Sequence, residues 1–315
     1  MEPVIVIHGG AGGYRFSNDE EKLKYVKELE NATANGLKAL QNGGAVDAVE
    51  AAVSSMEDSG LFDAGKGSVL TISGNVEVDA GIMDGKSMRI GAVAAVRNVA
   101  NPIKLARMIM EKTNHVIIVG DGATELARLW RLYTPTHKLY NDAKSRRYED
   151  MLKDYMNGKG YFSSNLKLIN ELGIGDTVGA VALDKDGNLA AGTSTGGVWL
   201  KLDGRVGDSP IPGAGYWAQN GVAAFSASGL GEVIVRSMIC IRASYLVEGG
   251  LSIGEALRRV VNYVTERYGN GLVGVIGIDA KGNVASAFNT SAMARAWGRG
   301  GKVMRIAFYP DDTWP

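Results

Sequence analysis

The sequence is poor in the residue types on which metal centres and disulfide frameworks depend. Its 315 residues include a single cysteine, Cys240, and three histidines, His8, His115 and His137. One thiol excludes an internal disulfide and a multi-thiolate metal site, and three histidines offer few candidates for a histidine-rich metal centre or a Ser-His-Asp triad. Because Cys240 lies in an apolar run, we expect it to be buried and unreactive.

The sequence also has no excess of charge of either sign and no long hydrophobic run. Its 34 lysine and arginine residues balance 34 aspartate and glutamate residues, so no electrostatic signature indicates nucleic acid or an anionic membrane as a partner. No stretch approaches the ~20 apolar residues of a membrane span, and the start lacks the basic leader and apolar core of a signal peptide. We therefore expect a soluble, cytoplasmic protein.

Glycine, by contrast, is abundant, filling 43 of 315 positions against a usual share of about 7%. Most of these glycines are expected in tight turns. The cluster at residues 8–13 follows a β-branched run at residues 4–7, which predicts a buried strand that ends in a glycine loop. The spacing of a phosphate-binding loop is missing there, so we expect no phosphate site, and we expect His8 to be a core histidine with satisfied hydrogen bonds.

An internal repeat organises the second half of the chain. Residues 178–190 and residues 273–285 each contain an apolar run, an Asp-x-x-Gly-Asn turn and a second apolar run, which predicts two hairpins. Continuous apolar strands indicate sheets covered on both faces, and grouped strands with helices of similar total length favour sheets between helix layers. Helices are expected near residues 17–42, 45–56, 101–112, 121–133, 231–248 and 252–268, with three short strands within 67–96 and one at 115–120.

Residues 136–172 are rich in charge and have weak periodicity. We interpret residues 136–176 as a mobile linker, with a charged surface helix near residues 145–156 as the alternative. The segment ends at Asp176 and Thr177.

Thr177 stands directly before the first repeat, where the second repeat has Leu272. A threonine can stand there simply because its β propensity is good. The chemical alternative is that its hydroxyl is a nucleophile, which needs a base. A free α-amino group on Thr177 itself, with a reference pKa of about 7.7–8.0, would supply that base from the same residue. This requires cleavage of the Asp176–Thr177 bond.

Residues 175–182 resemble the self-cleavage segment of isoaspartyl peptidases, plant-type asparaginases and glycosylasparaginases, which are N-terminal nucleophile hydrolases. Six further segments resemble that family in the same order along nearly the whole chain: residues 8–12, 61–67, 77–80, 193–197, 205–210 and 229–232. The resemblance implies a four-layer α-β-β-α sandwich of the α+β class. It also implies one domain over residues 1–315, cleaved into 1–176 and 177–315, and a homodimer of cleaved protomers.

The resemblance also implies roles for individual residues. Thr177 would attack the side-chain amide carbonyl of the substrate and form an acyl-enzyme, and Thr195 would bind and tune the nucleophile. Ser228 and the Gly229 N–H would form the oxyanion hole, in a loop that also suits a helix cap.

Three further residues would bind the substrate by the same resemblance. Arg205 would bind the substrate α-carboxylate as a planar, bidentate donor; its alternative is a surface salt bridge with Asp203 or Asp208. Asp208 and the Gly231 carbonyl would accept hydrogen bonds from the α-ammonium group.

The chain departs from the family pattern at three positions. Ser228 replaces a threonine but keeps the hydroxyl, Leu230 replaces an often polar residue near the pocket, and Asp63 replaces an asparagine and adds charge near the pocket. The family also binds a sodium ion through backbone carbonyls. The matching residues here are Met56, Glu57, Ser59, Phe62, Ala64 and Lys66, and no organic cofactor is expected.

The expected activity is release of L-aspartate from L-asparagine, from β-aspartyl dipeptides, or from both. Two alternatives stay open from the sequence: a glycosylasparaginase-type hydrolase, and an uncleaved, catalytically silent binding protein.

Overall fold

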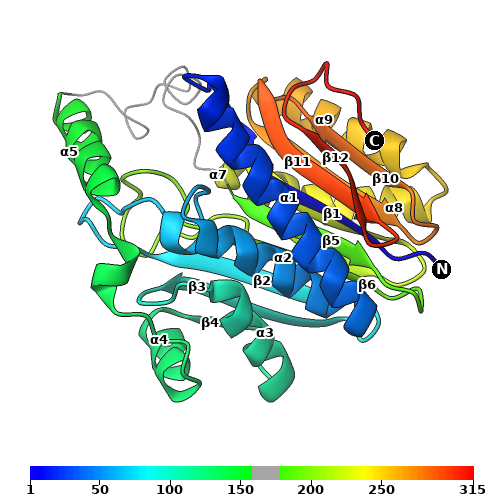
Figure 1. Cartoon of the computed structure of the whole chain (residues 1–315), viewed down its shortest axis with the longest axis horizontal. Coiled ribbons are helices and arrows are strands. Elements are labelled where there is room, and N and C mark those ends of the chain that lie inside the picture. Colours follow the sequence, from blue (N-terminus) through cyan, green and yellow to red (C-terminus); the bar gives the residue numbers. More distant parts are fainter. Residues whose placement is uncertain (158–176) are drawn as a thin grey trace.

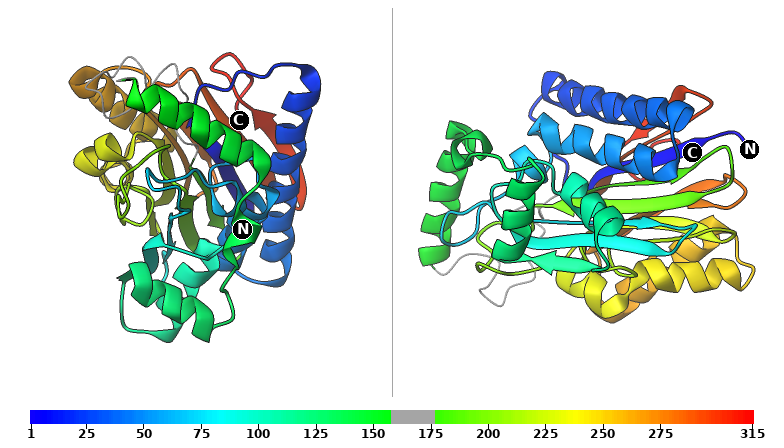
Figure 2. Two further views of the ribbon diagram at one scale, coloured as in Figure 1. Left: turned by 90° about the vertical axis from the view of Figure 1, so that its left-hand side faces the viewer. Right: turned by 90° about the horizontal axis from the view of Figure 1, so that it is seen from below.

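Two β-sheets form the centre of the protein (Figures 1 and 2). The structure, a computed structural model, describes residues 1–157 and 177–315. The larger sheet has the order β12-β11-β1-β5-β6-β2-β3-β4 and the smaller one β10-β9-β8-β7. The strands are β1 (Val4–Gly12), β2 (Val78–Asp84), β3 (Arg89–Val96), β4 (Ile117–Val119), β5 (Val178–Leu183), β6 (Leu189–Thr195), β7 (Tyr216–Gln219), β8 (Ala223–Gly229), β9 (Val273–Asp279), β10 (Val284–Phe288), β11 (Ala292–Arg299) and β12 (Lys302–Ala307).

Helices cover the outer face of each sheet, and the inner faces of the sheets pack on each other. The helices are α1 (Asp19–Asn42), α2 (Ala45–Ser59), α3 (Pro102–Lys112), α4 (Gly120–Leu129), α5 (Asp142–Met156), α7 (Gly231–Ser237), α8 (Ile239–Glu248) and α9 (Ile253–Tyr268). Helices α1, α2 and α3 lie on the larger sheet and α8 and α9 on the smaller one, while β1, β5 and β6 contact strands β7, β8 and β9 (Figure 2). None of the helices in the described ranges is both long enough and apolar enough to cross a bilayer.

Burial follows from this arrangement. Every residue of β1, β5, β6 and β8 is buried, which confirms that the continuous apolar runs belong to strands covered on both faces. The helices and strands of the structure confirm the predicted mixed α and β content. Helix α1 begins where expected, with the Asn18 side chain accepting a hydrogen bond from the Glu21 backbone N–H at 2.8 Å.

The internal repeat corresponds to the hairpins β5–β6 and β9–β10. In the first turn Asp184 Oδ1 accepts from the backbone N–H of Asn188 at 2.9 Å, and in the second Asp279 Oδ1 accepts from that of Asn283 at 2.9 Å. The first aspartate of the Asp-x-x-Gly-Asn motif therefore closes the turn in both hairpins, as in an Asx-type turn. The sequence repeat is thus a repeat of turn chemistry as well as of strands.

Three predictions of local structure were wrong in detail. The glycine cluster after residue 7 continues β1 to Gly12, because β11 pairs with it throughout, with a bulge between His8 and Gly10. Residues 67–96 contain two strands and not three. The predicted helix 231–248 is divided into α7 and α8 at Met238, whose φ is 48°.

The interpretation of residues 136–156 as mobile linker was also wrong. A 3-10 turn, η2 (Thr136–Leu139), leads into α5, which is the helix considered as the alternative. Lys144 fixes α5 because its Nζ donates to the carbonyls of Lys66 at 2.8 Å and Leu139 at 2.7 Å. Tyr148 adds a hydrogen bond to the Ile72 carbonyl at 3.0 Å. The rest of the linker prediction falls on residues 158–176, outside the described residues.

Candidate active site

Strand register brings the two expected threonines together. Val178 of β5 pairs with Ser194 of β6, so Thr177 and Thr195 are the next pair at the end of the ladder. Thr177 is buried, and its Oγ1 donates a hydrogen bond to Thr195 Oγ1 at 3.3 Å. The Gly197 backbone N–H also donates to Thr195 Oγ1, at 2.9 Å. The structure thus brings the proposed nucleophile and its proposed partner into direct contact.

The Thr177 side chain points between the two sheets. Side chains two residues apart on a strand share a face, so Gly179 reports the direction of Thr177. A Cβ on Gly179 would overlap Ser226 of β8 in the smaller sheet, as well as the ring of His8. The hydroxyl pair therefore lies at the end of the inter-sheet space, and Gly179 is required because its neighbours leave no room for a side chain.

His8 is the residue whose part in the site the sequence did not reveal. Its Nδ1 lies 3.0 Å from the Thr177 carbonyl oxygen and its Nε2 lies 2.8 Å from Ser226 Oγ. A carbonyl oxygen only accepts, so we assign the proton to Nδ1, and Nε2 then accepts from the Ser226 hydroxyl. Burial lowers the pKa of His8 to about 3, which keeps the ring neutral. The expected satisfied core histidine is confirmed, and it also holds the backbone of Thr177.

The expected oxyanion-hole residues end strand β8. Ser228 is buried, and its Oγ accepts from the Ala11 backbone N–H at 2.9 Å. Gly229 has a φ of 137°, which favours glycine, and a Cβ there would overlap the Leu272 carbonyl. Leu230 packs in the apolar cluster between the smaller sheet and its helices.

Arg205, Asp208 and Gly231 converge on one place. A Cβ on Gly231 would lie 2.8 Å from Arg205 Nη2 and 3.1 Å from Asp208 Oδ1. Arg205 also forms a two-pronged ion pair with Glu232 at the start of α7, with distances of 2.9 and 2.8 Å. The ion pair with Glu232 is not one of the two that the sequence suggested for Arg205, which were with Asp203 and with Asp208. Asp203 pairs with Arg97 at 3.2 Å.

Asp208 has the properties of a receptor for a positive group. It is buried, and its Oδ2 has no hydrogen-bond partner among the described residues. Burial raises the pKa of its carboxyl to about 7, and the nearby Arg205 opposes that rise. An unpaired buried carboxylate oxygen is costly, so a bound ammonium group would supply the missing partner.

Asp63 lies beside the threonine pair. Its backbone carbonyl accepts from the Gly196 N–H at 3.0 Å, next to Thr195, and its Oδ1 accepts from the Val69 N–H at 2.8 Å. Its Oδ2 is buried without a partner among the described residues. Burial raises the pKa of Asp63 to about 7, and the positive charges of Lys201, Lys144 and Arg147 limit that rise.

The loop that follows α2 presents backbone carbonyls. A Cβ on Gly67 would overlap the Phe62 carbonyl oxygen, and one on Gly65 would lie 2.8 Å from that of Glu57, so carbonyls crowd around these glycines. Two of the carbonyls expected to bind sodium already accept other donors: that of Lys66 accepts from Lys144 Nζ at 2.8 Å, and that of Met56 accepts from the Ser59 hydroxyl at 2.7 Å. No group of three or more His, Cys, Asp or Glu side chains within the described ranges could hold a metal ion.

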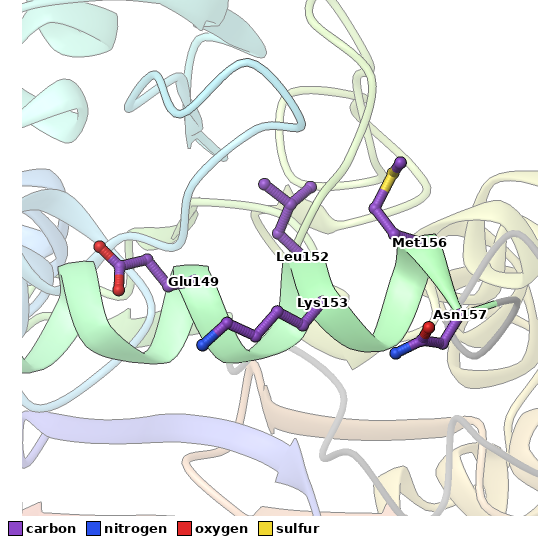
Figure 3. Close-up of a pocket in the computed structure, with 5 residues that line it drawn as sticks. All are labelled: Glu149, Leu152, Lys153, Met156 and Asn157. Carbon is purple, nitrogen blue, oxygen red and sulfur yellow. The ribbon is translucent and has the colours of Figure 1, made fainter.

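One expected site residue and one surface hollow remain to be described. Asp176 lies outside the described residues. A hollow of about 420 Å³ beside α5 contains none of the expected site residues (Figure 3). It is lined by Glu149, Leu152, Lys153, Met156 and Asn157.

Comparison with known proteins identifies the family to which the chain belongs. A family model described as asparaginase matches residues 1–308, and the chain therefore belongs to the asparaginase family. It is 54% identical, over 95% of its length and 98% of the relative's, to a protein named plant-type L-asparaginase from Pyrobaculum calidifontis. It is 41% identical, over 97% and 96%, to isoaspartyl peptidase of Escherichia coli K12. It is also 41% identical, over 99% and 97%, to isoaspartyl peptidase/L-asparaginase of Danio rerio.

Proposed function

We propose that this protein is a self-cleaving amidohydrolase that releases L-aspartate from L-asparagine and from β-aspartyl dipeptides. The observation that carries the proposal is the buried Thr177–Thr195 hydroxyl pair at the end of the inter-sheet space. The names of the relatives support the substrate class.

The chemistry follows from cleavage before Thr177. The freed α-amino group takes the proton of the Thr177 hydroxyl, and Oγ1 attacks the β-carbonyl carbon of the substrate. The Ser228 hydroxyl and the Gly229 N–H donate to the oxyanion of the tetrahedral intermediate. The amine leaves with the proton, and a water molecule then hydrolyses the ester between aspartate and Thr177, which restores the hydroxyl.

Substrate orientation comes from the charges beside α7. Arg205 binds the α-carboxylate, and Asp208 together with the Gly231 carbonyl binds the α-ammonium group. The buried, unpartnered oxygen of Asp208 supports this assignment, because a zwitterionic α-carbon group supplies both the anion for Arg205 and the cation for Asp208.

The proposal also includes the fold, the assembly and a bound ion. We assign the layered arrangement of helices and sheets to the four-layer α-β-β-α sandwich of N-terminal nucleophile hydrolases, one domain formed by residues 1–176 and 177–315. The mature form would be a cytoplasmic homodimer without organic cofactor. A sodium ion would be held by backbone carbonyls of residues 56–66, at the end of α2 and in the segment that follows it.

The test is a kinetic comparison of fully processed wild type and Thr33→Ala with Thr177→Ala, which we expect to stay uncut. L-asparagine, β-Asp-Leu and an N-linked glycosyl-asparagine are offered to wild type, to Thr177→Ala and to Thr33→Ala, which removes a buried hydroxyl on α1. We expect wild type and Thr33→Ala to hydrolyse the first two substrates and Thr177→Ala to be inactive. Preference for the glycosyl substrate would indicate a glycosylasparaginase. A wild type without activity would indicate a binding protein.

A further inference from the structure

Residues 63–74 support the turn that follows β6. The Asp63 carbonyl accepts from the Gly196 N–H at 3.0 Å, directly after Thr195. A Cβ on Gly196 would overlap Asp63 Oδ1, so the turn packs closely on the 63–74 segment. The next residue, Gly197, donates its N–H to Thr195 Oγ1 at 2.9 Å. The segment thus holds the turn that carries the hydrogen-bond partner of the proposed nucleophile.

The contact between the segment and the turn continues beyond Gly196. The Leu200 N–H donates to the Leu70 carbonyl at 2.9 Å. The Ile72 N–H donates to the Lys201 carbonyl at 2.8 Å. These bonds join backbone to backbone, so a displacement of the segment would be passed on to the turn.

Helix α5 fixes the same segment through two side chains. Lys144 Nζ donates to the Lys66 carbonyl at 2.8 Å, and the Tyr148 hydroxyl donates to the Ile72 carbonyl at 3.0 Å. Lys144 Nζ also donates to the Leu139 carbonyl at 2.7 Å, just before α5. One ammonium group therefore ties the segment to the start of the helix.

Lys144 is a costly residue for a position that only anchors a helix. It is 8% exposed, and a buried ammonium group is unfavourable unless it is paired. Burial lowers the pKa of Lys144 to about 8, and the charge of Asp63 opposes that fall. Asp63 has one buried oxygen without a hydrogen-bond partner among the described residues. An apolar side chain would anchor α5 at lower cost, so the ammonium group indicates that its donors and its charge are needed.

We propose that Lys144 is a positioning residue for hydrolysis, which holds the 63–74 segment where it keeps Thr195 aligned with Thr177. The ammonium group fixes the Lys66 carbonyl, and the segment fixes the turn after β6. The turn holds Thr195 Oγ1, which accepts from the Thr177 hydroxyl at 3.3 Å. Lys144 acts on the reaction only through these contacts, and the inference rests on the proposed function of Thr177.

Lys144→Met tests the proposal because it keeps the length of the side chain and removes the donors and the charge. We expect kcat for L-asparagine to fall by about tenfold, the scale of a lost hydrogen bond to a charged group. KM should change by no more than about threefold, because Arg205 and Asp208 bind the substrate. Lys153→Met is the matched control on the same helix. Lys153 is exposed and lies 3.9 Å from Asp150, so this variant should keep the wild-type kcat and KM.

Two further variants keep the test decisive if Lys144→Met does not fold. Tyr148→Phe removes one neutral hydrogen bond to the segment, and we expect kcat to fall by about threefold. Asp63→Asn removes the charge that faces the ammonium group. In that background Lys144→Met should lower kcat by a smaller factor than in wild type, because the two charges are coupled.

Amide hydrogen exchange follows the same contacts without the reaction. In Lys144→Met we expect exchange to be faster by about tenfold in residues 63–74 and 196–201. The hairpin of residues 273–285 should exchange at the wild-type rate. Lys153→Met should match wild type throughout.

A wild-type kcat in both Lys144→Met and Tyr148→Phe would overturn the proposal, as would a rise in KM without a fall in kcat. Faster exchange spread evenly over the whole chain would mean that Lys144 only stabilises the fold, and would overturn it as well. A wild type that does not hydrolyse L-asparagine would instead refute the proposed function. The two failures are therefore distinct.

Discussion

His8 Nδ1 lies 3.0 Å from the carbonyl oxygen of Thr177, so the backbone of the proposed nucleophile is anchored by a neutral ring from another strand. Ser226 fixes the ring from the other side at 2.8 Å. The hydroxyl of Thr177 is thereby left to Thr195. His8 is thus a positioning residue and not a base for the hydroxyl.

The anchor can be tested by His8→Phe, which fills the space but removes both hydrogen bonds. We expect a loss of about 2 kcal/mol in stability, because Ser226 and the Thr177 carbonyl lose their partner, together with slower self-cleavage. The pKa of His8 is lowered to about 3, so it does not titrate between pH 5 and pH 9. A limb in the wild-type pH profile within that range that vanishes in the variant would assign a proton-transfer role to His8.

Arg205 offers a test of substrate binding. Lysine keeps the charge but loses the planar fork that binds a carboxylate with two bonds. We expect Arg205→Lys to raise KM for L-asparagine by about tenfold, the equivalent of one charged hydrogen bond, with a smaller change in kcat. Steady-state kinetics measure both.

Glu232→Gln is the matched control because it weakens the same ion pair from the other side. We expect a much smaller rise in KM for this variant than for Arg205→Lys. Equal effects of the two substitutions would mean that Arg205 only pairs with Glu232 and does not bind the substrate.

The stability difference between wild type and Asp63→Asn should depend on pH, because Asp63 is buried. Its pKa is raised from 3.8 to about 7 by burial, so the folded state prefers the protonated form. The stability that this proton contributes is full below pH 3.8 and is lost as pH rises through 7. Asp63→Asn mimics the protonated form at every pH. Its advantage over wild type should grow between pH 5 and pH 8 toward an upper bound of about 4 kcal/mol.

Denaturant unfolding of wild type and Asp63→Asn at both pH values measures this difference. Asp184→Asn serves as the comparison, because each oxygen of that carboxylate accepts backbone or side-chain donors and its loss should destabilise at both pH values. A constant difference between wild type and Asp63→Asn across the range would contradict the ionisation of Asp63 in the folded protein.

Much of the fold was readable from local pattern. The two hairpins were predicted from the recurring Asp-x-x-Gly-Asn pattern, and the structure gives both turns the same hydrogen bond. Helix α9 was expected near residues 252–268, and the structure shows that the Ser252 side chain caps it by accepting from the Glu255 N–H. The extension of β1 to Gly12 was missed because its pairing with β11 spans nearly the whole chain, and no local signal reports such a partner.

The site residues also divide into those that the sequence identified and those that it did not. Thr177 was identified because the second repeat has Leu272 at the matching position. The other site residues, Thr195, Arg205 and Asp208, were identified only through resemblance to a family. His8 was expected only as a core histidine, because its contact with the site comes from strand register, which places it opposite Gly179. Residues 136–156 were interpreted as linker, with the helix as the alternative, because no local pattern reports that Lys144 donates to the carbonyl of Lys66, 78 residues away.

The most direct test of the proposed mechanism is intact-mass analysis of purified wild type and Thr177→Ala, with activity measured on the same samples. We expect wild type to give two fragments, one of which begins at Thr177 and carries a free amino group, and Thr177→Ala to give one uncut, inactive chain. An uncut wild-type chain that hydrolyses L-asparagine at full rate would contradict the central role of the Thr177 hydroxyl and its own amine.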